Sequence, residues 1–338
     1  MGLTDTRRYI FREVRENDSK KIYNLALSQN YHSDTLPQNL SLIKTCVKKS
    51  VLDFQLTRKG NRIQRPRYMF VLEDTADGSI VGTSQIADRP WRLLYRVILN
   101  LDILSQSTFS SSLELRKEEE IWELGGLLLS DSIRKKGYGK LISYGRLLYL
   151  WSMNIAPSNL LISGFNAALP SFWERVTKLG GIAKKDVPTC WRSMDTLYTV
   201  FFRALPASIA FDDLGLSFNS LEELLSTPIP IHPNAEAARR LLTRMGFVFL
   251  AEIEADGALW YGAPWQTVKN ILRALMSIPE LMLYDTCAPA CHRDIAIVVL
   301  NTEEFHARIV PIEKVEDGYV VVSKRNLPLA DIRHLFVF

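Results

Sequence analysis

One segment near the middle of the chain constrains the fold most, because it joins an apolar run, a basic glycine loop and an amphipathic stretch. Residues 121–129 are apolar apart from one glutamate and contain the consecutive glycines Gly125 and Gly126. This composition predicts a buried strand whose glycines permit a bulge or a close backbone approach by a ligand. Loop 134–140 follows, and apolar residues at helical spacing come after it. The predicted order is therefore strand, basic loop, helix.

The loop itself has the chemistry of an anion-binding nest. Its glycines let successive N–H groups turn toward one point, and the following helix adds the positive end of its dipole. The pattern has neither the third glycine of a dinucleotide-binding fingerprint nor the Gly-Lys-Ser/Thr ending of a P-loop. The residues alone thus leave a pyrophosphate site and an ordinary glycine turn both open. The loop reads Arg134, Lys135, Lys136, Gly137, Tyr138, Gly139 and Lys140.

Length and composition exclude several classes of protein. A chain of 338 residues favours two domains or one duplicated unit, and 47% hydrophobic with 23% charged residues is in the globular range. Disordered and fibrous classes are excluded. A net charge of +4 suits an anionic ligand, but no concentrated basic stripe predicts a nucleic-acid partner. The basic segment 58–67 reads more readily as a solvated loop than as an anion site.

The cysteines and the hydropathy pattern indicate a reducing compartment. Cys46, Cys190, Cys287 and Cys291 are too few and too scattered for a disulfide framework, so we expect free thiols and a cytoplasmic protein. No window reaches about 18 uncharged apolar residues, so no membrane partner is expected. Cys287, Cys291 and His292 could form half of a zinc site but have no second ligand pair, and we expect no metal cofactor.

Other segments predict further strands. Residues 9–14 alternate like a strand, and residues 68–73 and 80–87 form a hairpin with good turn chemistry between them. Residues 91–104 predict a strand, whereas the Ser-rich and charged stretch 105–120 predicts a surface connection. Short strands are expected near the C-terminus, at 307–312, 319–323 and 335–338.

A recurrence suggests an internal duplication. Asn166 and Asn234 each follow an apolar strand and precede a helix that ends at glycine. We therefore expect an N-terminal lobe over 1–204, a second lobe over 205–300 and a small β-rich cap over 301–338.

The strand with Gly125 and Gly126, together with the basic loop, resembles the acetyl-coenzyme A binding core of the GNAT acyltransferase superfamily. In that superfamily the loop amides hold the coenzyme pyrophosphate, and a backbone N–H of the bulged strand polarises the thioester carbonyl. The resemblance implies an acyl-CoA cosubstrate and the following coenzyme contacts: Leu127, Leu128, Leu129, Arg134, Lys135, Lys136, Gly137, Tyr138, Gly139 and Lys140.

A narrower resemblance, to arginine N-succinyltransferases, covers nearly the whole chain. It rests on the segments 70–75, 81–84, 123–129, 134–143, 171–173, 232–242, 246–247, 300–301 and 305–308. It implies an α+β, two-lobed, duplicated GNAT-like fold with mixed, mainly antiparallel sheets. The implied reaction transfers succinyl from succinyl-CoA to the α-amine of arginine, as in arginine catabolism. In the family the His of the His-Pro motif is the catalytic acid/base, which corresponds to His232, and a leucine that corresponds to Leu127 contacts the acyl-CoA.

Elementary chemistry is compatible with this role of His232. An amine that attacks a thioester loses a proton and the leaving thiolate gains one, and imidazole can take part in both transfers. The simpler alternative is that His232 ends an apolar strand and caps a helix that begins at Pro233. Leu242 stands where many GNAT enzymes have an acidic tyrosine.

The sequence departs from the family at 125–126, 162–165 and 255–260, where the family has other and partly charged residues. The acceptor amine, the acyl group and the substrate-binding residues therefore stay open. Two further functions stay open as well, a catalytically silent GNAT-like subunit and a transferase for a protein or peptide amine. Assembly as a homo- or hetero-oligomer is compatible with each.

Overall fold

The computed structural model of the chain describes residues 8–28, 36, 38–88, 91–100, 108–117, 121–157, 160–166, 231–254, 258–276, 281–284, 295–300, 302–311, 313–314, 320–323 and 332–337. The chain folds into two compact units. Unit 1 consists of Met1–Ala87, Leu124–Pro157 and Pro264–Phe338, and unit 2 of Asp88–Glu123 and Ser158–Ala263. This division does not follow the linear boundaries at 204 and 300, because distant segments of the chain pair in one sheet.

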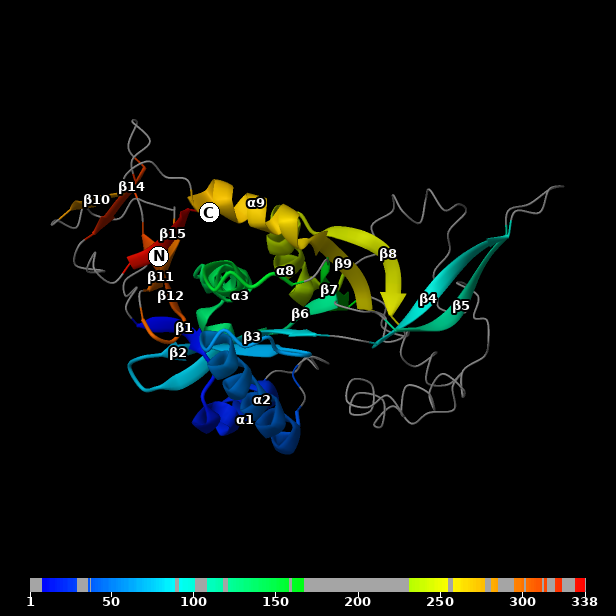
Figure 1. Cartoon of the computed structure of the whole chain (residues 1–338), viewed down its shortest axis with the longest axis horizontal. Coiled ribbons are helices and arrows are strands. Elements are labelled where there is room, and N and C mark those ends of the chain that lie inside the picture. The colour runs from blue at the N-terminus through cyan, green and yellow to red at the C-terminus, as the bar shows by residue number, and fades with distance from the viewer. Residues whose placement is uncertain are drawn as a thin grey trace. The chain divides into compact units, whose positions relative to one another are not determined.

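The sheet of unit 1 has the strand order β15-β11-β12-β1-β2-β3-β6 (Figure 1). Antiparallel pairing joins β1 to β2, β2 to β3, β1 to β12, β11 to β12 and β11 to β15. Part of the expected C-terminal cap therefore belongs to the main sheet, since β12 pairs directly with β1. The strands are β1 (Tyr9–Glu13), β2 (Arg67–Asp74), β3 (Ser79–Asp88), β6 (Ile121–Leu129), β11 (Ile295–Leu300), β12 (His306–Pro311) and β15 (Ile332–Val337).

Helices lie on both faces of this sheet. Figure 1 shows α1 and α2 on one side, with α3 and α9 on the other. The side chain of Asn39 caps α2 by accepting the N–H of Leu42 at 3.1 Å. The helical segments are η1 (Glu16–Asp18), α1 (Ser19–Ser28), α2 (Leu40–Arg58), η2 (Asp131–Ile133), α3 (Tyr138–Ser152) and α9 (Trp265–Met276). A separate three-stranded sheet contains β10 (Leu281–Tyr284), β13 (Glu313–Lys314) and β14 (Val320–Ser323).

Aromatic rings form the core of unit 1. Phe11 stacks on Phe70 with ring centroids 5.1 Å apart, and Tyr149 of α3 contacts Phe54 of α2 at 5.3 Å. Phe305 lies 5.4 Å from Tyr149, so the segment before β12 contributes to the same core. Burial of such large apolar rings is the main stabilising contribution to a domain of this kind.

The strands of unit 2 pair in both parallel and antiparallel directions. The first residues of β6, Ile121–Glu123, pair in parallel with Leu160–Ile162 of β7, and Trp260 packs with Ile121 and Ile162. β4 and β5 form a long antiparallel hairpin, so the surface connection expected over 105–120 contains a strand instead. The elements are β4 (Trp91–Asn100), β5 (Thr108–Lys117), β7 (Leu160–Asn166), α8 (Pro233–Arg244), β8 (Val248–Glu254) and β9 (Ala258–Pro264).

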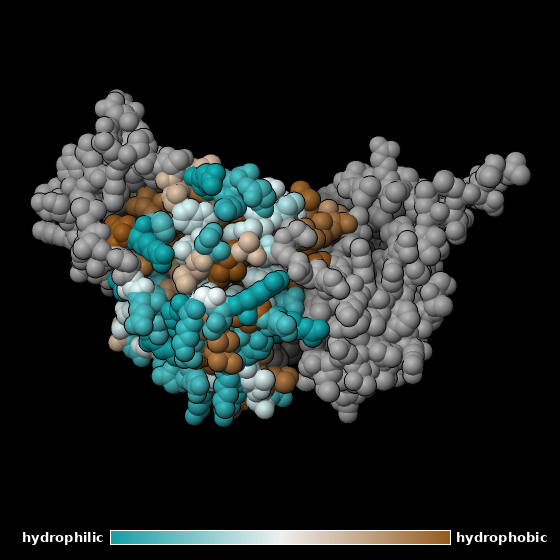
Figure 2. Space-filling view, viewed as in Figure 1, coloured by the Kyte–Doolittle hydropathy of each residue, from teal (hydrophilic) through white to brown (hydrophobic). Residues whose placement is uncertain are grey.

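The described residues that are visible on the face shown in Figure 2 are largely hydrophilic. The coloured part of Figure 2 shows polar residues with small separate apolar groups. Among the residues whose side chains the structure describes, the exposed large apolar ones are Leu27, Leu52 and Val248. Within the described residues, no helix has the length and apolar character needed to cross a membrane.

Candidate functional site

Strand β6 is irregular at its two glycines, as the sequence predicts. Gly126 has φ of +58°, a left-handed conformation that side-chain-bearing residues rarely adopt. A Cβ atom there would also lie 3.0 Å from Cγ of Gln85. The hydroxyl of Thr83 donates to the carbonyl oxygen of Gly126 at 2.8 Å. Conformation, space and a buried hydrogen bond thus fix this part of the strand.

A buried arginine supports the same place from α3. Arg146 is 1% exposed, and its Nη1 donates to the carbonyl oxygens of Gly125 at 3.0 Å and Gln85 at 3.2 Å. Its Nε donates to the carbonyl of Ser143 within the helix. A guanidinium taken out of water requires such partners, and here backbone carbonyls supply them. These hydrogen bonds therefore hold helix α3 against the irregular part of strand β6.

The three leucines that follow the glycines alternate between the two faces of the sheet. Leu128 is buried, whereas Leu127 and Leu129 are half-buried. The side chain of Leu129 covers Gly82, where an added Cβ would lie 3.1 Å from Leu129 Cδ1. The contact of Leu127 with an acyl-CoA stays a prediction.

The basic loop forms the predicted turn at the start of α3. Gly137 is the N-cap residue with φ of +88°, and Lys135 has φ of +62°. Within the described residues, the N–H groups of Lys135, Lys136, Gly137 and Gly139 donate to no protein acceptor. Unpaired N–H groups at the positive end of a helix are the usual form of an anion site.

The cationic side chains of the loop differ in whether they have a partner within the described part of the chain. Arg134 is engaged with its own loop, since its Nε lies 2.9 Å from the carboxylate of Asp131. The Nζ of Lys136 donates to the carbonyl of Ser132 at 2.9 Å. Lys135 is exposed, and the described part of the chain shows no partner for it. Tyr138 is buried and packs edge-on against Tyr9, so its ring anchors the loop to β1.

His232 caps helix α8 of unit 2. Its Nδ1 accepts the N–H of Asn234 at 3.3 Å, and Pro233 occupies the first helical position. Leu242 is buried in the core of its unit, so the position at which many GNAT enzymes have a tyrosine carries no acid here. The capping alternative is thus observed, and a catalytic role stays a prediction. His232 belongs to unit 2, whereas the loop belongs to unit 1.

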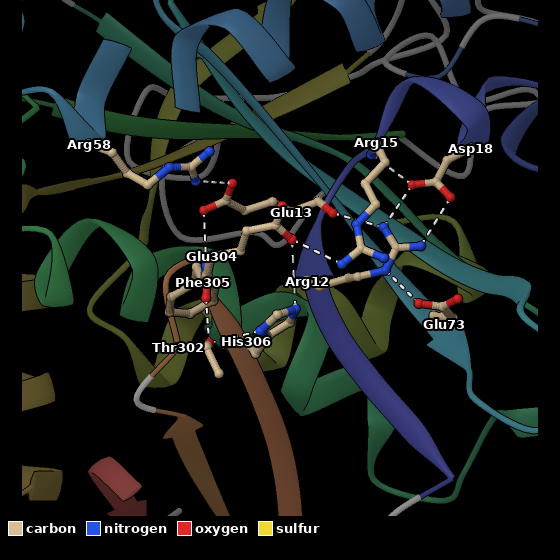
Figure 3. A network of polar contacts seen from close by, with 10 residues as sticks. All are labelled: Arg12, Glu13, Arg15, Asp18, Arg58, Glu73, Thr302, Glu304, Phe305 and His306. Atoms are coloured by element: carbon tan, nitrogen blue, oxygen red, sulfur yellow. Dashed lines mark hydrogen bonds and ion pairs between the residues drawn. The ribbon is translucent and has the colours of Figure 1, made fainter. Parts of the chain in front are cut away.

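A second polar cluster, shown in Figure 3, joins the elements around β1. Both Nη atoms of Arg12 bind the carboxylate of Asp18, at 2.7 and 3.0 Å, and its Nε binds Glu73. Burial lowers the pKa of Arg12, but these ion pairs outweigh burial and leave it above its usual value. Glu13 forms an ion pair with Arg58 and accepts the backbone N–H of Phe305, the residue before β12.

The cluster also contains titratable groups of unusual pKa. Burial raises the pKa of Glu13, although Arg58 opposes it. Burial lowers the pKa of His306, whose Nδ1 lies 2.8 Å from Thr302 Oγ1 and whose Nε2 lies 4.0 Å from the carboxylate of Glu304. Because the bonds run between β1, α2 and the segment before β12, we assign this cluster a structural role.

Metal ligation receives no support from the described residues. They contain no group of three or more His, Cys, Asp or Glu side chains that could hold a metal ion. Cys287, Cys291 and His292 lie outside the described residues.

Sequence reasoning missed Thr83, Arg146 and the side-chain pair of Arg67 and Gln85. Arg67 Nη1 donates to Gln85 Oε1 at 2.8 Å, beside Gly126. Thr83 falls in a segment that carries the family resemblance, which is a weak signal. Arg146 interrupts an apolar helical stripe. This pattern does not indicate what Arg146 binds, because the carbonyl oxygens of the main chain leave no mark in the sequence.

These elements and their order define an α+β fold that is similar to that of a succinyltransferase subunit of known structure. The structure of arginine/ornithine succinyltransferase subunit AI from Pseudomonas aeruginosa is similar over 98% of this chain and 98% of that chain, with a TM-score of 0.69 and 17% identity. At that identity the likeness shows the fold.

A family match over part of the chain comes from the sequence. Residues 9–156 match the family described as "Arginine N-succinyltransferase beta subunit". The match covers less than half of the chain, and over that part it bears out the resemblance to arginine N-succinyltransferases.

More distant structures add no argument. A ribosomal-protein-S5-alanine acetyltransferase from Vibrio fischeri is 10% identical, covering 76% of this chain and 93% of its own, with a TM-score of 0.37. An acetyltransferase from Thermus thermophilus is 11% identical, covering 77% and 99%, with a TM-score of 0.35. A search of curated proteins found no match.

Proposed function

We propose that the chain transfers succinyl from succinyl-CoA to the α-amine of arginine or of a related small amine. The observation that carries the proposal is the loop before α3, whose N–H groups at Lys135, Lys136, Gly137 and Gly139 have no acceptor in the described part of the chain. These amides would bind the coenzyme pyrophosphate, and the positive end of α3 would add to the attraction.

The irregular strand β6 would orient the reacting thioester. Thr83 and Arg146 fix the carbonyl groups of Gly126 and Gly125, so the peptide units that follow are held in one orientation. A backbone N–H in a fixed position near Leu127 can polarise a thioester carbonyl without reorganisation during the reaction. The neutral amine attacks the carbonyl carbon and forms the C–N bond of the amide. The nitrogen gives up one proton, the C–S bond breaks, and the coenzyme thiolate takes up a proton.

His232 is the proposed acid/base, and its cap bears on how it could act. The neutral ring that accepts the Asn234 N–H at Nδ1 carries its proton on Nε2. A further proton must then go to Nδ1, so capping and proton transfer use the same atom. His232 can therefore take a proton only when it releases the cap, a loss typically worth about 1 kcal/mol.

Release of free thiol from succinyl-CoA, with and without arginine, tests the proposal. We expect thiol release that depends on the amine, with succinylated arginine as the product by mass spectrometry. A protein that binds the coenzyme but releases no thiol with any small amine would instead fit a silent subunit. Release with peptide amines alone would favour a protein acceptor.

The assembly is also open to proposal. The similar structure and the matching family are both described as subunits. We therefore propose that the chain works as part of an oligomer, and light scattering of the purified protein would give its mass in solution.

A further inference from the structure

Several described arginines of unit 1 have a carboxylate partner. The pairs are Arg8 with Asp74, Arg12 with Asp18, Arg15 with Glu304, Arg58 with Glu13, and Arg134 with Asp131. Arg67 differs from them. Its side chain is half-buried, and within the described residues its guanidinium binds only the amide oxygen of Gln85.

A carboxylate that contacts the main chain of Arg67 is used in another way. Asp53 accepts the main-chain N–H of Arg67 at 2.7 Å and pairs with Lys49 at 2.8 Å, but it does not bind the Arg67 guanidinium. A guanidinium has five N–H donors in a rigid fork, and Gln85 takes one of them. Four donors are left on a cation that is partly out of water, which favours an anion that arrives from outside the chain.

The position of Arg67 relates it to strand β6. In the β2–β3 ladder Met69 is opposite Gln85 and Arg67 is opposite Ala87, so Arg67 and Gln85 are diagonal neighbours on one face. The side chain of Gln85 lies against Gly126, with its Cγ 3.0 Å and its Nε2 3.3 Å from the place of a Cβ atom. The guanidinium is therefore one side chain away from the irregular part of β6.

We propose that Arg67, oriented by Gln85, is a specificity-determining residue that binds a carboxylate of a substrate beside Gly126. The proposal rests on the proposed function, because it takes β6 as the place of the thioester. Two carboxylates have the required chemistry: the terminal carboxylate of a succinyl group, and the α-carboxylate of an amino-acid acceptor. Either would form two parallel hydrogen bonds with the fork.

Calorimetric binding to the full chain, with two pairs of ligands, tests the proposal. Succinyl-CoA and butyryl-CoA differ in the carboxylate of the acyl group. Arginine and agmatine, titrated in the presence of coenzyme A, differ in the carboxylate of the acceptor. We expect Arg67→Gln to weaken binding of the carboxylate-bearing member of one pair by about 10- to 100-fold, as for a hydrogen bond to a charged group. The other member should bind unchanged.

Two variants make the result specific. Arg62→Gln removes an exposed arginine of the same basic segment and should leave all affinities unchanged. Arg67→Lys retains the charge without the fork and should give an intermediate loss. If Arg67→Gln fails to fold, as judged by circular dichroism, the lysine variant carries the test alone.

The outcomes separate the sources and the two proposals. A loss confined to succinyl-CoA assigns the acyl carboxylate, and a loss confined to arginine assigns the acceptor carboxylate. Equal binding of both members of each pair by the wild-type chain, or an equal loss for both members in the variant, overturns the subsite. If Arg67→Gln loses binding selectively but the wild-type chain shows no turnover, the subsite is supported and the proposed function is overturned. If the wild-type chain turns over and Arg67→Gln does not alter turnover, the proposed function is supported and the subsite is overturned.

Discussion

Replacement of Gly145 by alanine should destabilise the protein, although the same change in a helix interior normally stabilises. Gly145 lies within α3, where it faces β1. A Cβ atom at this position would be 2.5 Å from Cε1 and 2.7 Å from Cδ1 of Phe11. Phe11 is fully buried and packs on Phe70 and Phe305, so its ring cannot move without displacing other rings.

The magnitude follows from two opposing terms. Alanine gains about 1 kcal/mol over glycine in a helix interior. Carbon atoms are in optimal contact at about 3.5–4.0 Å, so the added methyl overlaps the ring by about 1 Å. Overpacking of a dense core costs about 1–3 kcal/mol, and an overlap against a ring fixed by other rings belongs at the upper end. We therefore expect a net loss of about 2 kcal/mol in the free energy of unfolding.

Gly139→Ala is the matched control on the same helix. Nothing lies within 4 Å of a Cβ atom at Gly139, so alanine should gain about 0.4–1 kcal/mol by reducing the freedom of the unfolded chain. Urea unfolding followed by circular dichroism gives both midpoints, and a shift at constant slope reports stability. A Gly145→Ala protein as stable as wild type would refute the close approach of α3 to β1.

Three further changes test the site and its surroundings. The double variant Gly137→Val, Gly139→Val should abolish coenzyme A binding in calorimetry with the far-ultraviolet spectrum retained, whereas undiminished binding would identify the loop as an ordinary turn. His232→Ala should lower kcat by about 10²- to 10⁴-fold with little change in acyl-CoA binding; full activity in His232→Asn, which can cap but not titrate, would assign His232 to capping alone. Burial lowers the pKa of His306 below its ordinary 6.5, so the unfolded state binds the proton more readily and stability should fall as pH drops below that value. His306→Gln should remove this part of the pH dependence, as urea midpoints at about pH 7.5 and about pH 5.5 would show.

Local patterns in the sequence were sufficient for the elements that surround the site. The apolar run 121–129 is strand β6, and the hairpin expected from 68–73 and 80–87 is β2 and β3. Each of these predictions rests on periodicity and turn chemistry within one short segment. The structure confirms these predictions. They could be made because each short segment alone supplies the alternation and the turn residues.

Pairing between distant segments could not be predicted in this way. Strand β12 joins β1 through Phe11 opposite Ala307, and nothing in either segment names the other as its partner. Likewise, β5 lies in a Ser-rich and charged stretch that resembles a loop, and it is a strand because it pairs along the full length of β4. Tertiary context outweighs local propensity in both cases.

The polar contacts at β6 could not be predicted from the sequence, for a related reason. Arg146 and Thr83 bind carbonyl oxygens, which every residue carries, so no sequence pattern reveals the partner. Arg67 belongs to a basic segment that as a whole reads as solvated, yet its side chain is half-buried against Gln85. A charge run can thus contain one member whose side chain is half-buried and hydrogen-bonded within the fold.

Three glycines in β6 and α3 differ in whether the fold requires a glycine at their position. Gly126 is required by conformation and by space, and Gly145 by space alone. Gly139 is required by neither, since its surroundings are open, and a helix would be more stable with alanine there. Gly139 carries one of the N–H groups that have no acceptor in the described part of the chain and that are proposed to bind the pyrophosphate. Stability measured for Gly139→Ala and binding measured for the valine double variant therefore separate the needs of the fold from the needs of the ligand.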